Sequence, residues 1–226
     1  MTPDSKPFTR AQLQAASRAI LREGRWANAR VSRATIGGID WTVKDFGSRS
    51  WWVRNLFGRW LLRRELRALG TLAGIDGVPQ QAFRVDAHAI AARFVPGLTL
   101  DRAPREQLDQ AFFLALESLL RQVHARGLVH LDSRGSSNLL ATPQGQPAVI
   151  DFQAALRTTL MPAPLRRLLE AVDMGGVYKN WLRYAPQSLD AERRARYERS
   201  TRLRRLWIGR GYFGVRKERH RGTGQP

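Results

Sequence analysis

Three short runs in the second half of the chain contain side chains whose types and spacing suit chemistry on a phosphate. They are His130–Asp132, Asn138 and Asp151–Phe152. Phosphoryl transfer from ATP needs hard oxygen ligands that hold Mg²⁺ on the phosphates, and a carboxylate that orients the attacking hydroxyl and accepts its proton. We expect Asp132 to be this base, Asn138 and Asp151 to be the metal ligands, and His130 to brace the loop by hydrogen bonding.

The sequence between these residues predicts how they are brought together. Apolar runs at Leu139–Ala141 and Ala148–Ile150 flank the turn-forming segment Pro143–Gln146, and Leu128–Leu131 is a further short apolar run. Short apolar runs separated by Pro, Gly and polar residues are typical of paired strands. We predict a hairpin that brings Asp132, Asn138 and Asp151 together.

The pattern His130-x-Asp132, then Asn138, then Asp151-Phe152 resembles the catalytic loop and metal-binding motif of protein-kinase-like enzymes. Its trimmed form is similar to bacterial kinases grouped near the RIO-type atypical kinases and the lipopolysaccharide-core sugar kinases. The resemblance implies transfer of the γ-phosphoryl group of ATP to the hydroxyl of a protein Ser/Thr or of a sugar.

Residues nearer the N-terminus extend this resemblance. Lys44, at the end of an extended run, resembles the strand lysine that holds the α and β phosphates, and Glu65 resembles its ion-pair partner. Phe94 and Val95 fall where such enzymes have the hinge between lobes, and the resemblance implies that their backbone meets the adenine. Lys44, Glu65, Phe94 and Val95 are thus the expected nucleotide-binding residues.

The chain also departs from the protein-kinase pattern. Asn138 is six residues after Asp132, where most protein kinases have a spacing of five. Between Gly24 and Val31, where a glycine-rich phosphate loop is expected, Gly24 is the single glycine, and Gln153 replaces the usual glycine after Asp151-Phe152. These departures motivate an alternative hypothesis, a non-catalytic kinase-like scaffold that binds membrane or nucleic acid through its arginines.

The expected fold class is α+β, with one kinase-like domain over residues 1–226. We predict a small N-terminal lobe with an antiparallel sheet over residues 1–95 and an abbreviated, mostly helical C-terminal lobe over residues 96–190. A basic tail over residues 191–226 follows. The chain is long enough to bury a substantial core.

Periodicity and turn residues predict the elements of both lobes. In the first lobe these are a helix at Arg10–Arg22 capped by Thr9, a hairpin of Val31–Ile36 and Ile39–Phe46 turning at Gly37-Gly38, a helix in the later part of Ser50–Leu69, and a strand at His88–Ala92. In the second lobe, a helix is expected at Glu106–Arg126, ended by Gly127, and most of the chain after Asp151 is expected to be helical.

The composition points to a polyanionic partner. Lys and Arg number 38 and Asp and Glu 19, which gives a net charge of +19. Nucleic acid, anionic lipid headgroups and phosphorylated glycolipids all offer a dense field of phosphates to arginine. A third hypothesis is a small-molecule phosphotransferase of the antibiotic-kinase type, which would have an acidic acceptor cleft. The net positive charge makes this hypothesis less attractive. The chain has no cysteine, so disulfides and thiolate chemistry are excluded.

Two segments carry the expected partner surfaces. Trp51–Trp60 mixes large aromatic residues with arginines, which suits either a membrane interface or packing of the tryptophans between the lobes. The tail has arginines interleaved with apolar residues, which predicts a basic amphipathic helix. Such a helix binds anionic lipid, binds nucleic acid or only keeps the protein soluble, and of these we favour the membrane. Met1–Arg10 has no secretory pattern, and Ala111–Leu120 is too short to span a bilayer. We therefore expect a cytoplasmic protein, with any membrane contact peripheral.

Overall fold

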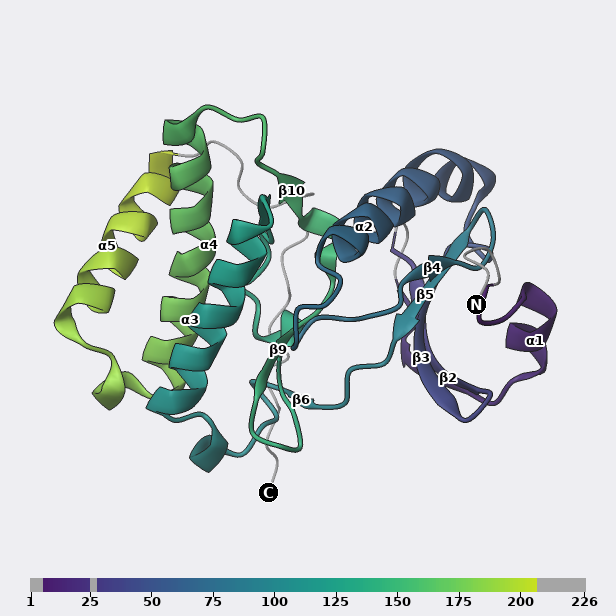
Figure 1. The fold of residues 1–226 in the computed structure, drawn as a ribbon, viewed down its shortest axis with the longest axis horizontal. Helices are drawn as coiled ribbons and strands as arrows, with labels where there is room; N and C mark the ends of the chain where they lie inside the picture. The colour runs from purple at the N-terminus through teal and green to yellow at the C-terminus, as the bar shows by residue number, and fades with distance from the viewer. Residues whose placement is uncertain (1–5, 25–27, 207–226) are drawn as a thin grey trace, which may run out of the picture.

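The computed structural model describes residues 6–24 and 28–206, with side chains described as far as Arg202, and has a mixed α+β fold. At one end of the molecule lies a sheet with the helix α2; at the other end α3, α4 and α5 lie together (Figure 1). The connection Phe94–Gly97 leads from the last strand of the sheet to the helical part. The sequence-based boundary at residues 95 and 96 lies in this connection.

A five-stranded antiparallel sheet forms the N-terminal part, in the order β1-β2-β3-β5-β4. Its strands are β1 (Arg18–Arg22), β2 (Arg30–Ile36), β3 (Ile39–Asp45), β4 (Phe83–Arg84) and β5 (Ala89–Arg93). The turn between β2 and β3 is Gly37-Gly38, and both glycines have positive φ, as the tight turns of two-residue hairpins require. The predicted hairpin is confirmed, and so is the predicted strand at His88–Ala92.

The predicted helix at Arg10–Arg22 is correct only in its first half. The helix α1 spans Arg10–Ala15, and Thr9 caps it by accepting from Gln12, as expected. The chain then becomes extended at Ala16 and forms β1, whose backbone pairs with β2. Ile20 and Leu21, which had suggested a helical face, are exposed on this edge strand. Tertiary pairing with the hairpin outweighed a weak local helical pattern.

Helix α2 (Arg59–Thr71) follows a π-helical turn, η1 (Val53–Gly58), and packs on the sheet. Its inner face includes Leu61 and Leu62, which cluster with Phe46 and Ile90. A Cβ on Gly58 would lie 2.7 Å from the ring of Phe46, so glycine permits this close approach. The predicted helix after the hairpin is confirmed.

The second part contains helices α3 (Gln110–Ala125), α4 (Ala163–Tyr184) and α5 (Ala191–Leu206), together with short strands and turns. These are β6 (Leu98–Thr99), β7 (Leu128–Val129), β8 (Leu139–Ala141), β9 (Pro147–Val149) and β10 (Leu156–Arg157), with the turns η2 (Arg105–Gln107), η3 (Ser136–Asn138), η4 (Phe152–Ala154) and η5 (Pro186–Ser188). The largest apolar cluster joins α3 and α4 to Leu69 and Leu72 at the end of α2, so one core spans both parts of the molecule.

Helix α3 begins four residues later than predicted. Glu106 belongs to η2, and α3 begins at Gln110 because the Asp109 carboxylate accepts from the N–H of Phe112 and caps the first turn. Its end before Gly127, which has positive φ, agrees with the prediction. Among the helices of the described residues, α4 and α5 included, none has the length and apolar character to cross a bilayer.

The hairpin of β8 and β9 is confirmed. Leu139 pairs with Val149 and Leu140 with Ala148, across the predicted turn. The predicted tail begins as α5, and its part beyond residue 206, with Arg210 and Phe213, lies outside the described residues. Of the tryptophans in Trp51–Trp60, none packs between the two parts of the molecule, because Trp51, Trp52 and Trp60 are all exposed.

Candidate active site

A buried lysine joins two carboxylates from distant segments. Lys44 Nζ lies 2.6 Å from Glu65 Oε1 and 2.6 Å from Asp151 Oδ1. Lys44 comes from β3, Glu65 from α2 and Asp151 from the loop after β9. The side chains of Lys44 and Glu65 are 9% and 4% exposed, whereas Asp151 keeps 18% of its side chain in contact with solvent. The cluster therefore has a closed side at the helix and an open side at Asp151.

The sheet register explains why a lysine is buried here. Lys44 is paired with Ile90 on the neighbouring strand, and Ile90 packs against the inner face of α2. Paired residues of adjacent strands point to the same face of a sheet, so Lys44 also faces α2. Glu65 lies on the buried side of that helix and meets it there.

The charges of the three groups shift one another's pKa. Burial raises the pKa of Asp151, but the charge and hydrogen bond of Lys44, followed by the charge of Arg22, outweigh burial and lower the pKa to about 2. Burial lowers the pKa of Lys44, but Asp151 and Glu65 outweigh it and raise the pKa. Burial raises the pKa of Glu65, and the charge of Lys44 offsets only part of that. At neutral pH, Lys44 and Asp151 are therefore both charged.

Asp132 and Asn138 lie together in the loop between β7 and β8. The Asn138 side chain donates from Nδ2 to Asp132 Oδ2 at 2.7 Å and to the Asp132 carbonyl at 3.2 Å. Asn138 is buried, while Asp132 is exposed. The carboxylate is thus held from behind by an amide and faces solvent, as a base that must reach an incoming hydroxyl requires.

The β8–β9 hairpin and His130 connect this loop to Asp151. The N–H of Ile150 donates to the Asn138 carbonyl at 2.9 Å, which continues the hairpin by one pair. His130 accepts from the N–H of Asp132 at Nδ1, so its proton is on Nε2, which donates to the Ile150 carbonyl at 3.0 Å. The completely buried His130 therefore braces the loop, as the sequence predicts, and does not face solvent as a reactive group.

The structure adds a positioning residue that the sequence reading missed, Asp173 of α4. Its buried carboxylate accepts from the N–H of His130 at 2.7 Å and of Leu131 at 2.9 Å, and from the Ser133 hydroxyl. Leu131 has a positive φ of 62°, which is a strained conformation for a leucine. The hydrogen bond from its N–H to Asp173 helps to hold this conformation. His124 bonds to the same carboxylate at 3.0 Å, a role that the sequence did not suggest.

A signal for Asp173 was present in the sequence. It is a carboxylate in the apolar stretch Ala171–Val177 and is followed by Gly175-Gly176. A Cβ on Gly176 would lie 2.4 Å from Ser133 Oγ, so the glycine lets α4 approach the loop closely. A charged residue beside paired glycines in a helix indicates a close polar contact with another backbone.

Two arginines also belong to the site, and no sequence pattern distinguishes them from the other arginines. Arg22, at the end of β1, lies 3.5 Å from Asp151 Oδ2. Arg64 of α2 donates to the carbonyls of Ala154 and Ala155 at 2.8 Å and 2.7 Å. Arg64 therefore ties the helix that carries Glu65 to the segment immediately after Asp151.

Phe94 and Val95 follow β5 and line a pocket of about 320 Å³ together with Val78, Pro96 and Thr142, among others, and none of the charged residues of the cluster lines it. The N–H of Phe94 already donates to the Asp40 carbonyl at 2.9 Å, which leaves its carbonyl and the backbone of Val95 for a ligand. The expected phosphate loop at Gly24–Val31 includes residues 25–27, which lie outside the described residues.

The donor set near Asp151 fits a magnesium ion bound with a nucleotide. Within residues 6–24 and 28–206, no three His, Asp or Glu side chains form a group that could hold a metal ion by themselves. Magnesium in phosphotransferases is instead bound by one or two protein oxygens and by the phosphates. Asp151 offers a carboxylate, and Asn138, whose Nδ2 faces Asp132, offers its Oδ1.

Comparisons of the chain with protein-family models and with curated protein sequences return no match.

Proposed function

We propose that this protein is an ATP- and Mg²⁺-dependent phosphotransferase that transfers the γ-phosphoryl group to a hydroxyl. The observation that carries the proposal is the ion-pair cluster in which Lys44 lies between Glu65 and Asp151. Burying a cation and two carboxylates costs desolvation free energy, and apolar residues in the same three positions would stabilise the fold as well. The presence of charged residues here is explained if Lys44 and Asp151 bind a nucleotide and its metal ion.

The arrangement of the elements supports a two-lobed, protein-kinase-like fold as part of this proposal. A small antiparallel sheet with one helix carries Lys44 and Glu65, and a mostly helical part carries Asp132, Asn138 and Asp151. In protein kinases, the lysine and glutamate pair and the aspartate that binds magnesium come from the same kinds of element. The connection at Phe94–Gly97 would then be the hinge.

Each nucleotide-binding role can be assigned to a residue. Lys44 binds the α and β phosphates, and Glu65 holds Lys44 in place. Asp151 and Asn138 would hold Mg²⁺, which would supply positive charge to neutralise the phosphates. The backbone at Phe94 and Val95 contacts the adenine. Arg22, beside Asp151, adds a second cation near the phosphates.

Asp132 acts on the acceptor. Its exposed carboxylate accepts a hydrogen bond from the acceptor hydroxyl and orients the oxygen towards the γ-phosphorus. The new bond forms between that oxygen and the phosphorus, and the bond from the phosphorus to the β,γ-bridging oxygen breaks. The hydroxyl proton passes to Asp132, and ADP leaves. The acceptor class that this chemistry supports is an alcohol, either a protein Ser/Thr or a sugar of the lipopolysaccharide-core type.

Nucleotide binding tests the proposal without knowledge of the acceptor. ATP binding is measured by calorimetry with and without Mg²⁺ for the wild type, for Asp151→Ala and for the control Asp76→Ala, which changes an exposed aspartate outside the cluster. We expect Mg²⁺-dependent binding by the wild type and the control, and its loss in Asp151→Ala. A folded wild type that binds no ATP would contradict the proposal and favour the non-catalytic scaffold.

A further inference from the structure

The helix beside the candidate site presents large apolar side chains to solvent. Trp51, Trp52, Leu56 and Trp60 are 55%, 69%, 62% and 47% exposed. A single exposed apolar residue needs no explanation, but an exposed cluster of three tryptophans and a leucine indicates an interaction surface.

These residues occupy one side of a continuous helical segment. Trp52, Leu56 and Trp60 recur every four residues through η1 and into α2, and the exposed Arg63 and Arg67 continue the same side. The opposite side is buried on the sheet. We refer to the exposed residues Trp51, Trp52, Leu56, Trp60, Arg63 and Arg67 as the Trp-Arg face.

The charged side chains on the surface of this segment are all positive. Arg54 and Arg59, both partly exposed, add to Arg63 and Arg67, and the single acidic residue between Gly47 and Ile75 is Glu65. Because Glu65 is buried and paired with Lys44, it does not reduce the positive potential outside. The Trp-Arg face thus combines insertable aromatic rings with cations, and the segment exposes no carboxylate.

The Trp-Arg face is fixed relative to the candidate site. The guanidinium of Arg64 lies over the Trp60 ring, 5.2 Å from the ring centroid. The same group donates hydrogen bonds to the carbonyls of Ala154 and Ala155, shortly after Asp151. Asn55 Oδ1 accepts from His88 Nε2 at 3.0 Å, which ties η1 to the sheet. Binding at this face would therefore hold the whole site in one orientation.

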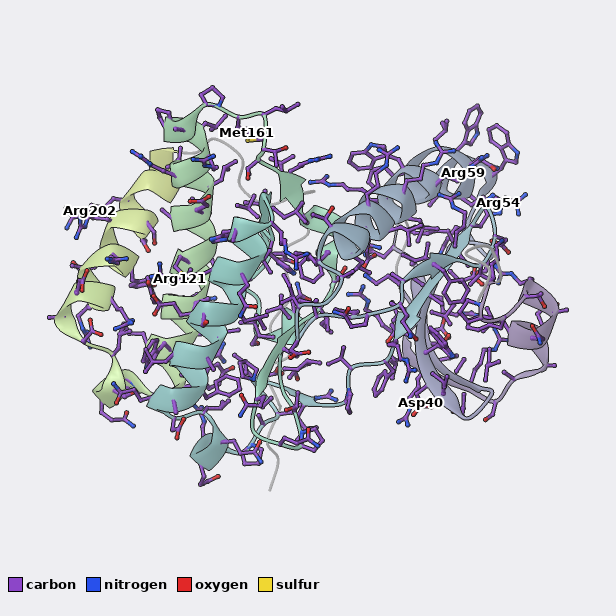
Figure 2. All side chains as sticks on the ribbon, viewed as in Figure 1. Asp40, Arg54, Arg59, Arg121, Met161 and Arg202 are labelled. Carbon is purple, nitrogen blue, oxygen red and sulfur yellow. The ribbon has the colours of Figure 1, made fainter. Side chains whose placement is uncertain are left out.

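A second exposed apolar side chain, Leu160, lies outside the Trp-Arg face. Figure 2 shows the labelled Arg54 and Arg59 on the edge where α2 lies, and the labelled Met161 farther along that edge. Leu160, next to Met161 in the chain, is 98% exposed.

We propose that the Trp-Arg face docks the protein on an anionic lipid bilayer. Tryptophan rings favour the headgroup region, where an apolar body and a polar N–H are both accommodated, and arginines bind lipid phosphates. Nucleic acid would use the cations but has no apolar layer for the exposed Leu56. A membrane uses both, and it brings the candidate site to lie beside a lipid surface.

Vesicle binding of the full chain tests this inference. Co-sedimentation and tryptophan fluorescence are measured with phosphatidylcholine vesicles that contain phosphatidylglycerol and with vesicles of phosphatidylcholine alone. The wild type is expected to bind the anionic vesicles with a blue shift of its emission. The double variants R63E/R67E and W51S/W52S should each lower the partition coefficient about tenfold or more, because a cation near an anionic surface and a buried ring each strengthen binding severalfold.

Matched variants separate this face from general charge and hydrophobicity. R102E/R105E makes the same charge change at two exposed arginines outside both α2 and the predicted tail, and L98S/L114S removes two exposed leucines elsewhere. The partition coefficients of both controls should stay within about threefold of the wild-type value. This change is smaller than the decrease expected when one membrane contact of the Trp-Arg face is lost. Equal losses in all four variants, equal binding to neutral vesicles, or binding to duplex DNA without binding to vesicles would each overturn the proposal.

The membrane inference and the proposed phosphotransferase function fail independently. The variants of the Trp-Arg face change none of the residues that would contact ATP, so their Mg²⁺-dependent ATP binding should equal that of the wild type. Asp151→Ala should retain vesicle binding, because Asp151 is not part of the Trp-Arg face.

Discussion

Lys44 and Asp151 form an ion pair of 2.6 Å although 107 residues separate them in the chain. The pair connects the sheet to the segment that follows the β8–β9 hairpin, and it brings into one place two side chains that the sequence had suggested for one nucleotide. The lowered pKa of Asp151 and the raised pKa of Lys44 both keep the pair charged at neutral pH.

Replacement of Asp132 with alanine should abolish turnover and leave nucleotide binding nearly intact. The carboxylate is exposed, and Asn138 supports it from behind, so its loss removes the base without opening the core. We expect ATP consumption to fall about 100-fold or more, the usual contribution of a general base. Steady-state ATP consumption and calorimetric ATP affinity are compared with those of the wild type. Full activity in Asp132→Ala would refute its role as the base.

The acid stability of the protein should depend on Asp151. Because its pKa is lowered from 3.8 to about 2, the ionised form stabilises the fold above about pH 4, and this contribution is lost as the pH falls towards 2. The loss amounts to about 2 kcal/mol, since each pKa unit corresponds to about 1.4 kcal/mol. Urea unfolding of the wild type and of Asp151→Asn is compared at about pH 5 and about pH 2. The variant should show the smaller decrease, and equal decreases would contradict the prediction.

Replacement of Asp173 with asparagine should destabilise the protein and disturb the loop. An amide can accept with one oxygen only, so at least one of the N–H donors of His130 and Leu131 loses its partner inside the core. An unsatisfied buried donor costs about 1–3 kcal/mol, and a broken contact to a charge costs more. Chemical denaturation gives the free energy of unfolding, and Asp101→Asn, at an exposed position, is the control. A change of less than about 0.5 kcal/mol would show that the contacts are dispensable.

Replacement by alanine should destabilise the protein at one glycine, Gly176, and not at another, Gly70. A Cβ on Gly176 would lie 2.8 Å from the backbone N of Arg134, which cannot move away without shifting the loop that carries Asp132. Gly176→Ala should therefore cost about 1–3 kcal/mol and lower turnover. Gly70, in α2, has open space around its Cβ position, so Gly70→Ala should be neutral or stabilise by up to about 1 kcal/mol. Thermal unfolding measures both, and a stable Gly176→Ala would contradict the close-approach argument.

Patterns confined to a few residues were read correctly from the sequence. The hairpin at Gly37-Gly38, the cap at Thr9 and the pairing across Pro143–Gln146 depend on local backbone preferences, which single residues reveal. Segments with weak local conformational preference were not predicted correctly. The stretch Arg18–Arg22 became a strand because β2 offered it a pairing partner, and this could not be known from its own residues.

The sequence by itself determined which residue types were present for chemistry: an aspartate and an asparagine in one loop, a second aspartate after a strand, and a lysine on another strand. Only the tertiary structure decided that Lys44 meets Asp151, that Asp173 holds the loop from α4, and that Phe94 lines a pocket with Val78 and Thr142. The physical reason is that composition and spacing fix local conformation, whereas side-chain contacts between distant segments depend on how the sheet, α2 and α4 pack together.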